Sequence, residues 1–189
     1  QYREATARVA AAGLQDRIAI ELRDYRSLEG TFTKIVSIEM FEAIGEAEFE
    51  TFFHTCDRLL APEGLVFVQT IAMPDQRYER YRRTTDWIKE YIFPGSLLPS
   101  LTAITNAVTA SSQLITHRVQ DIGSHYATTL STWSERFESN LPQVRAMGFD
   151  ETFIRTWRFY LAACEAAFRT RTIHDYQLLF TRPYNQSLR

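Results

Sequence analysis

Hydrophobic residues follow two different periods along this chain, and the change between them separates strands from helices. Apolar and polar residues alternate in "RIAIEL", residues 17–22, which predicts a strand. "TKIVSIEM", residues 33–40, is β-branched and almost continuously apolar, a pattern typical of a strand covered on both faces. After Gly45 the apolar residues recur at steps of three and four as far as Leu60, so an amphipathic helix is predicted there. "LVFVQTI", residues 65–71, then predicts another buried strand.

The second half of the chain is mainly helical in pattern. Asp150 is a suitable N-cap for the last and clearest amphipathic helix. Strand, helix and strand joined by short turns in the first half indicate a parallel sheet with helices on its faces, so the predicted fold class is α/β. The remaining predicted elements are helices over residues 2–12, 84–92, 101–110, 128–147 and 150–170, and strands over residues 114–119 and 176–181.

Composition narrows the class of protein. A chain of 189 residues that is 45% hydrophobic can form one sizeable core, so we expect one domain over residues 1–189. A net charge of -2 gives no electrostatic basis for nucleic acid binding. Cys56 and Cys164 are too few for a disulfide framework, which favours a reducing, cytoplasmic location. No apolar run approaches the ~18 residues of a membrane span.

Candidate chemistry gathers where the predicted strands end. Ligands of open α/β sheets bind at the carboxyl ends of parallel strands. From position alone, Glu39 and Glu42 are more readily explained as polar caps of a strand than as site residues. No two of the seven glycines are two positions apart, so this chain contains no G-x-G cofactor loop. The polar rim predicted at these strand ends consists of Asp24, Tyr25, Glu39, Glu42, Gln69 and Ile71.

Arginine and tyrosine residues alternate in "DQRYERYRRTTDW", residues 75–87. A solvated helix face is the simpler interpretation of such a run. The alternative is a basic surface for anionic lipid headgroups or an acidic carrier, with tyrosines at the interface. The pattern alone leaves both open.

Six segments in order resemble one enzyme family. They are "DYRSL", "SIEMFEAIG", "LLAPEGLVFVQTI", "YIFPGSLLPS", "HYATTLSTWSERF" and "ACEAAFRTRTIHDYQLLFTRP". Together they span most of the chain and are similar to the cyclopropane-fatty-acyl-phospholipid synthase and mycolic acid cyclopropane synthase family, whose members depend on S-adenosylmethionine. The resemblance implies a partial seven-stranded Rossmann-like methyltransferase sheet, with strands 3 to 7 present and several helices over the acyl-binding side.

The resemblance also implies a reaction. In this family an unsaturated acyl chain, here expected on a phospholipid, attacks the methyl group of the cofactor, and loss of a proton from the resulting cation closes a cyclopropane ring. Such a site must exclude water from the cation and still offer a polar group for the proton. Family members hold a bicarbonate ion for that purpose. By resemblance, its ligands here are Glu42, the backbone of Ile71 and Tyr126, while Gln69 stands where many members have histidine.

The cofactor side is represented less fully. By resemblance, Gln1 corresponds to a glutamine that approaches the adenosine, and Asp24, Tyr25 and Glu39 are the other candidate cofactor residues. The glycine-rich cofactor loop and a site cysteine of the family would precede Gln1. We therefore expect these 189 residues alone to bind S-adenosylmethionine poorly, and the activity of this chain alone to be weak.

Other functions stay open at this stage. A related methyltransferase could give a methyl-branched lipid or act on another small molecule, and a non-catalytic interaction module could keep the fold without the cofactor site. Peripheral contact with a membrane and a homodimer are compatible with the resemblance. No metal site is expected, because the four histidines form no i,i+4 pair.

Overall fold

The computed structural model of this chain describes residues 1–186 and residue 188. Its backbone contacts divide the chain into two units, Gln1–Gly30 and Thr31–Arg189. The first unit contains α1 (Tyr2–Ala11) and a 3-10 turn, η1 (Tyr25–Ser27). Residues 17–22 form no strand, contrary to the prediction, because this unit contains no other strand with which their backbone groups could pair.

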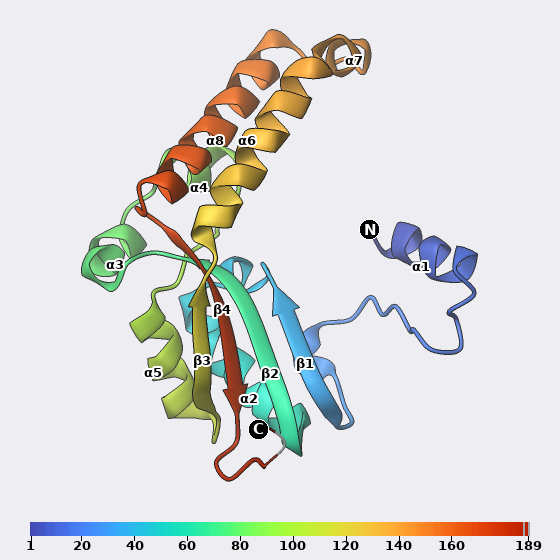
Figure 1. The fold of residues 1–189 in the computed structure, drawn as a ribbon, viewed down its shortest axis with the longest axis vertical. Helices are drawn as coiled ribbons and strands as arrows, with labels where there is room; N and C mark the ends of the chain where they lie inside the picture. The colour runs from blue at the N-terminus through green and yellow to red at the C-terminus, as the bar shows by residue number, and fades with distance from the viewer. Residues whose placement is uncertain (187, 189) are drawn as a thin grey trace. The chain divides into compact units, whose positions relative to one another are not determined.

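A four-stranded sheet is the centre of the second unit. Its strands are β1 (Phe32–Ile38), β2 (Leu60–Ala72), β3 (Ile115–Asp121) and β4 (His174–Thr181). They lie in the order β1-β2-β4-β3, with β1 parallel to β2 and β4 antiparallel to both of its neighbours (Figure 1). These four strands correspond to four of the strands 3 to 7 that the resemblance implies, so the α/β class is confirmed, although the first of the five, predicted at residues 17–22, is not formed.

The register of the strands brings polar residues to one end of this sheet. Ile38 of β1 lies opposite Gln69 of β2. Across the antiparallel pair, Gln69 lies opposite Gln177 and Ile71 lies opposite Asp175. The carboxyl ends of β1 and β2 therefore meet the beginning of β4 at the same edge.

The helices differ from the predicted ranges mainly where the chain turns. The predicted helix at 128–147 is two helices that meet at Asn140, and the predicted helix at 84–92 is a short one that begins after its cap, Asp86. The last helix begins as predicted, with the Asp150 side chain accepting a hydrogen bond from the Phe153 N–H at 2.7 Å. The helices of the second unit are η2 (Phe41–Ala43), η3 (Glu46–Glu48), α2 (Phe49–Leu59), α3 (Asp75–Arg82), α4 (Trp87–Tyr91), α5 (Leu101–Ser111), α6 (Gly123–Ser139), α7 (Leu141–Ala146) and α8 (Glu151–Arg169).

The main core forms between α2, α5 and the sheet. Phe53 of α2 packs edge-on against Phe180 of β4, with ring centroids 5.4 Å apart. Phe41 contacts Phe53 and is also fully buried. Burying a large apolar side chain of this kind contributes roughly 1.5–3 kcal/mol. Phe41 immediately precedes Glu42, so this core also fixes the turn that carries Glu42.

A second apolar cluster joins α6 and α8, which lie side by side beyond one end of the sheet (Figure 1). Its buried members are Ala127, Leu130, Leu161 and Phe168, and Ile71 and Tyr126 pack against them. We call these six residues the apolar wall. It ends at the edge of the sheet where β2 finishes.

One face of β1 is open, contrary to the prediction of a strand covered on both sides. Val36 is 63% exposed and Ile38 is 51% exposed, whereas Ser37 between them is buried. Successive residues of a strand point to opposite faces of the sheet, so the face of β1 that carries Val36 and Ile38 is uncovered in this structure, while the face that carries Ser37 is covered.

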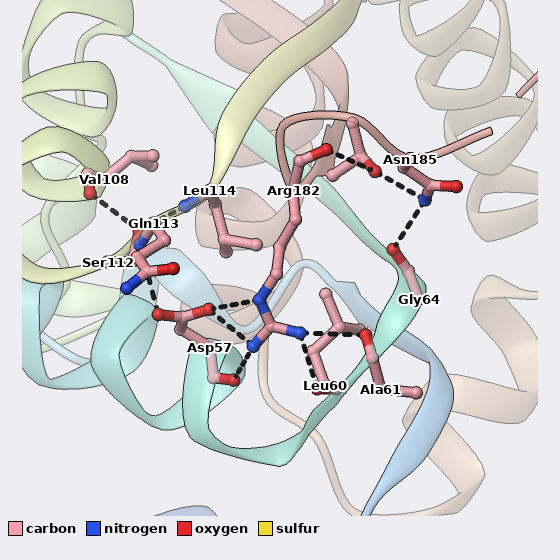
Figure 2. Close-up of polar contacts among 11 residues, drawn as sticks. Asp57, Leu60, Ala61, Gly64, Val108, Ser112, Gln113, Leu114, Arg182 and Asn185 are labelled. Carbon is pink, nitrogen blue, oxygen red and sulfur yellow. Dashed lines mark hydrogen bonds and ion pairs between the residues drawn. The ribbon is translucent and has the colours of Figure 1, made fainter. Parts of the chain in front are cut away.

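The opposite end of β4 is tied to α2 by Arg182, as Figure 2 shows. Its guanidinium donates to the Asp57 carboxylate at 2.8 Å and to the backbone carbonyls of Asp57, Leu60 and Ala61. Those carbonyls lie at or just beyond the end of α2, where helical carbonyls have no partner within the helix. The second Asp57 oxygen accepts from the Gln113 N–H at 3.1 Å. This network anchors the sheet at the end away from the polar residues.

Candidate active site

Four polar side chains meet at the end of the sheet where β1 and β2 finish. Glu39 and Glu42 follow β1, Gln69 is near the end of β2, and Asp175 is near the beginning of β4. We call these four residues the polar edge. The structure brings together the predicted Glu39, Glu42, Gln69 and Ile71, and adds Asp175, which the sequence patterns did not identify.

Glu42 is the most constrained of these acids. It lies in η2 with 9% of its surface exposed, and its Oε1 accepts a hydrogen bond from the Ile71 N–H at 2.5 Å. Its backbone carbonyl accepts from the Leu97 N–H at 2.9 Å. The other carboxyl oxygen, Oε2, is buried and has no hydrogen-bond partner. Burial raises the pKa of Glu42 to about 7, so near neutral pH its protonated and ionised forms are both populated.

Glu39 makes the turn that presents Glu42. Its φ of 54° lies in the left-handed region, which a residue other than glycine adopts at a steric cost. Its N–H donates to the Gln69 carbonyl at 3.0 Å, and its Oε1 accepts from the Gln69 side-chain amide at 3.0 Å. Two bonds to β2 thus hold this strained residue, and strain of that kind is common at functional sites.

A chain of amides crosses from β4 to the acids. Gln177 donates from Nε2 to Oε1 of Gln69 at 2.9 Å. Gln69 in turn donates from Nε2 to Glu39 and, at 3.4 Å, to Asp175. Sequence patterns missed both Asp175 and Gln177. The available signal was that Asp175 and Gln177 are polar and two positions apart, so that in a strand they lie on the same face of the sheet.

Asp175 is completely buried, and its Oδ1 has no hydrogen-bond partner. Burial raises its pKa to about 7, and the charges of Glu39 and Glu42 act in the same direction. Glu42 and Asp175 therefore both have pKa values near neutrality. Groups whose proton affinity is tuned to the working pH are typical of sites that move protons.

Tyr126 connects the polar edge to the apolar wall. It lies near the beginning of α6, and its ring is 4.9 Å from that of Phe168, centroid to centroid. Burial raises the pKa of Tyr126 to about 12, and the charges of Glu39 and Asp175 contribute to the rise. The phenol therefore keeps its proton and can act as a hydrogen-bond donor.

The remaining cofactor candidates belong to the first unit. Gln1 precedes α1, and Tyr25 is in η1. Asp24 caps η1, and its carboxylate binds the Arg26 guanidinium at 2.6 Å. That hydrogen bond lowers the pKa of Asp24 to about 2, so its charge is balanced locally in this structure.

The arginine and tyrosine run forms α3 and the turn after it. Arg82 pairs with Glu79 and with Glu46, and Arg83 also pairs with Glu79. Tyr78 is buried and donates to Glu46 at 3.0 Å. These acids neutralise part of the basic surface, which favours the interpretation as a solvated helix face.

Within the described part of the chain, no helix combines the length and apolarity that a membrane span needs. Over the same residues, no group of three or more histidine, cysteine, aspartate or glutamate side chains is arranged to hold a metal ion.

Comparison with known proteins agrees with the resemblance of the six segments. The profile of the family described as mycolic acid cyclopropane synthetase matches residues 1–178. The tuberculostearic acid methyltransferase UfaA1 of Mycobacterium tuberculosis is 41% identical over 182 residues, which cover 96% of this chain and 43% of that protein. The cyclopropane-fatty-acyl-phospholipid synthase of Escherichia coli is 37% identical over 172 residues, with 91% and 43% covered.

A solved structure shares the same arrangement. The mycolic acid cyclopropane synthase CmaA1, complexed with SAH and CTAB, superposes with a TM-score of 0.79 at 27% identity, covering 96% of this chain and 66% of that one. The chain spans less than half the length of the two relatives named above. By the extent of the profile match and by these relatives, the chain belongs to the mycolic acid cyclopropane synthetase family.

Proposed function

We propose that this chain carries the acyl site of a methyltransferase that modifies the double bond of an unsaturated fatty acyl chain. The observation that carries the proposal is Glu42, a buried acid with one unpartnered oxygen, at the border between the polar edge and the apolar wall. The names of the relatives support it, since they are lipid methyltransferases and cyclopropane synthases.

The chemistry requires a dry cavity wall and a group that handles one proton. The π electrons of the alkene form a bond to the methyl carbon while the bond from that carbon to the sulfonium sulfur breaks, with the electron pair staying on sulfur. The carbocation then loses a proton, and the C–H electron pair closes the ring. The apolar wall excludes water that would otherwise trap the cation. Glu42 and the Tyr126 hydroxyl supply the polar side of the site.

S-Adenosylmethionine would supply the electrophilic methyl group. A carboxylate at the polar edge suits a positively charged sulfonium electrostatically. Glu39 is the candidate on this unit for contact with the cofactor, and Gln1, Asp24 and Tyr25 are the candidates on the first unit. One structural neighbour is described as complexed with SAH, the demethylated form of this cofactor.

Bicarbonate, the ion implied by the family resemblance, fits this site through Glu42 and Tyr126. The unpartnered Oε2 of Glu42 can bind a ligand that carries an O–H group, and the Tyr126 phenol can donate to an anion. The Ile71 N–H and the Gln69 amide already bind carboxylates of this chain. Their role in this structure is therefore to hold Glu42 and Glu39. When bound, the ion would accept the proton that the reacting chain loses.

A methyl-branched or methylene product is the second candidate, and the 41% identity to a tuberculostearic acid methyltransferase favours it. The first cation is the same in both cases. A methylene branch would form if the hydride of the methyl-bearing carbon first shifted to the neighbouring cationic carbon and a proton of the methyl group were then lost, and a saturated methyl branch would in addition need a hydride donor. A phospholipid substrate would place the reaction at a membrane surface and require peripheral contact. We include in this proposal that the protein contacts the membrane peripherally, that it is located in the cytoplasm and that it forms a homodimer.

The test uses the complete protein, labelled S-adenosylmethionine and vesicles of an unsaturated phospholipid. Mass spectrometry of the released acyl chains should show the gain of one CH2 group. Catalytic hydrogenation then separates the products, because a methylene branch is reduced under mild conditions and a ring is not. Glu42→Gln serves as the control with the site acid removed. Acyl chains of unchanged mass with the wild-type protein would reject the proposed function.

A further inference from the structure

We propose that Asp175 is a third acid of this site, which carries a proton, donates it in a hydrogen bond to Glu39, and is held in place by the Gln69 and Gln177 amides. The consequence for catalysis rests on the proposed function above. The protonation of Asp175 does not depend on the proposed function, and it can be measured without any turnover.

The first argument is the crowding of the acids around one amide group. The Gln69 Nε2 lies 3.0 Å from Oε1 of Glu39 and 3.4 Å from Oδ2 of Asp175. Two carboxyl groups thus share one NH2 group. Two ionised carboxylates in such a place repel each other, and the arrangement is relieved when one of them holds a proton.

The second argument decides which of the two holds it. Asp175 is completely buried, and its Oδ1 has no partner. Glu39 is only partly buried, and its Oε1 accepts a hydrogen bond from the Gln69 amide at 3.0 Å. A buried carboxyl group is costly when charged and far less so when it is protonated and donates its hydrogen to a neighbouring carboxylate, and Glu39 is the hydrogen-bonding neighbour of Asp175. The proton therefore belongs on Asp175, whose pKa burial raises to about 7.

The third argument is the direction of the amide chain. Gln177 donates to the Gln69 oxygen, so the NH2 group of Gln69 must face the acids. A reversed Gln69 amide would place its oxygen against both carboxyl groups and its NH2 group against the NH2 group of Gln177. Gln177 is thus a positioning residue, which acts on the acids through Gln69.

Neighbouring elements present further charged groups to Asp175. Glu39 follows β1, Glu42 comes from η2, and Asp121 ends β3, and all three act to raise its pKa. Tyr126 comes from α6 and is neutral. The adjacent His174 turns its Nδ1 to Asp121 at 2.7 Å. The balance of these charges favours the protonated form of Asp175.

The three acids of the site have different roles in this proposal. Glu39 keeps the negative charge that suits the sulfonium, Asp175 supplies the hydrogen bond that holds Glu39, and Glu42 remains free to exchange a proton with the reacting centre. Asp175 is thus a positioning residue for the proposed reaction.

Infrared spectroscopy of the complete protein labelled with 13C-aspartate tests the protonation directly. At about pH 6, where an ordinary aspartate is ionised, the wild type should show the carbonyl stretch of a protonated aspartic acid, fading with a midpoint near pH 7. The band should be absent in Asp175→Asn. It should persist in Asp121→Asn, with a lower midpoint, because the Asp121 charge that raises the pKa of Asp175 is removed. A wild type without the band at about pH 6 overturns the inference.

The positioning role has its own readout. Gln177→Leu frees the Gln69 amide, so the midpoint of the Asp175 band should rise by about one pH unit. Gln120→Leu is the matched control, because Gln120 lies opposite Gln177 on β3 and is exposed. Equal midpoints in the two variants would contradict the role of Gln177.

Turnover of the acyl lipid then tests the consequence. Asp175→Asn keeps a donor toward Glu39 and should retain activity within about threefold, whereas Asp175→Leu, which has no donor, should lose at least about tenfold, or about 1.4 kcal/mol of barrier. Equal loss in both variants overturns the hydrogen-bonding role. If the wild type shows the infrared band but leaves acyl lipids unchanged, the proposed function is rejected while the protonation of Asp175 is confirmed.

Discussion

Replacing Glu42 with glutamine should make the folding stability of this chain less dependent on pH. The amide has the shape of the carboxyl group, and its oxygen can still accept from the Ile71 N–H. Its NH2 group would stand in place of Oε2, which has no partner in this structure. In the protonated wild type, the O–H group of Glu42 at this position likewise has no hydrogen-bond partner. The two side chains are therefore comparable at low pH and differ only when the acid ionises.

The sign follows from proton binding. The pKa of Glu42 is raised from 4.5 to about 7 in the folded chain. Between these values the folded state binds more protons than the unfolded state, so wild-type stability falls as pH rises through this window. One pKa unit corresponds to about 1.4 kcal/mol, so the loss approaches about 3 kcal/mol at about pH 8. This is a large share of the roughly 5–15 kcal/mol that stabilises a typical domain.

Urea unfolding of the wild type and Glu42→Gln at about pH 5 and about pH 8 measures the effect. The variant should gain about 2.5 kcal/mol relative to the wild type between the two conditions. Glu90→Gln is the matched control, since Glu90 is exposed on α4, and it should show no such gain. If the two variants respond equally to pH, the reasoning about the buried carboxyl group is refuted.

Three further predictions concern other parts of the structure. Arg182→Met removes the guanidinium that donates to the Asp57 carboxylate and to three carbonyls, so the free energy of unfolding in urea should fall by about 3 kcal/mol. Arg155→Met, at an exposed position of α8, should change it by no more than about 0.5 kcal/mol, and equal losses would refute the capping role. Tyr126→Phe keeps the packing on Phe168, so we expect unchanged thermal stability with at least about tenfold slower methylation of acyl lipid by the complete protein, and wild-type turnover would contradict the role of the hydroxyl. Calorimetric titration of the 189-residue chain with S-adenosylmethionine should show only weak binding, and micromolar affinity would disprove that expectation.

Sequence patterns predicted those elements whose signal is local. The last helix has both an apolar stripe and a capping aspartate, and it begins where the pattern placed it. Residues 17–22 alternate as a strand should, but a strand exists only where another strand pairs with it. The helix predicted at 128–147 continues through its period, yet the chain turns at Asn140 and begins again with Pro142 at the start of α7.

The site divides in the same way. Position alone favoured strand caps at Glu39 and Glu42, and resemblance to a family was needed to separate their roles. Asp175 follows Glu39 by more than one hundred residues, and only the antiparallel register of β2 and β4 brings it to the same edge. Such a register depends on long-range pairing, which local periodicity does not encode.

Another extended polypeptide segment can pair with the open edge of β1. Its outer N–H and C=O groups face away from β2, and exposed Val36 and Ile38 lie along the same strand. An extended segment supplied as a separate polypeptide could add beside β1 through main-chain hydrogen bonds, as peptides do at other sheet edges. The sheet can therefore be extended at β1 without any change in the pairing of its four strands.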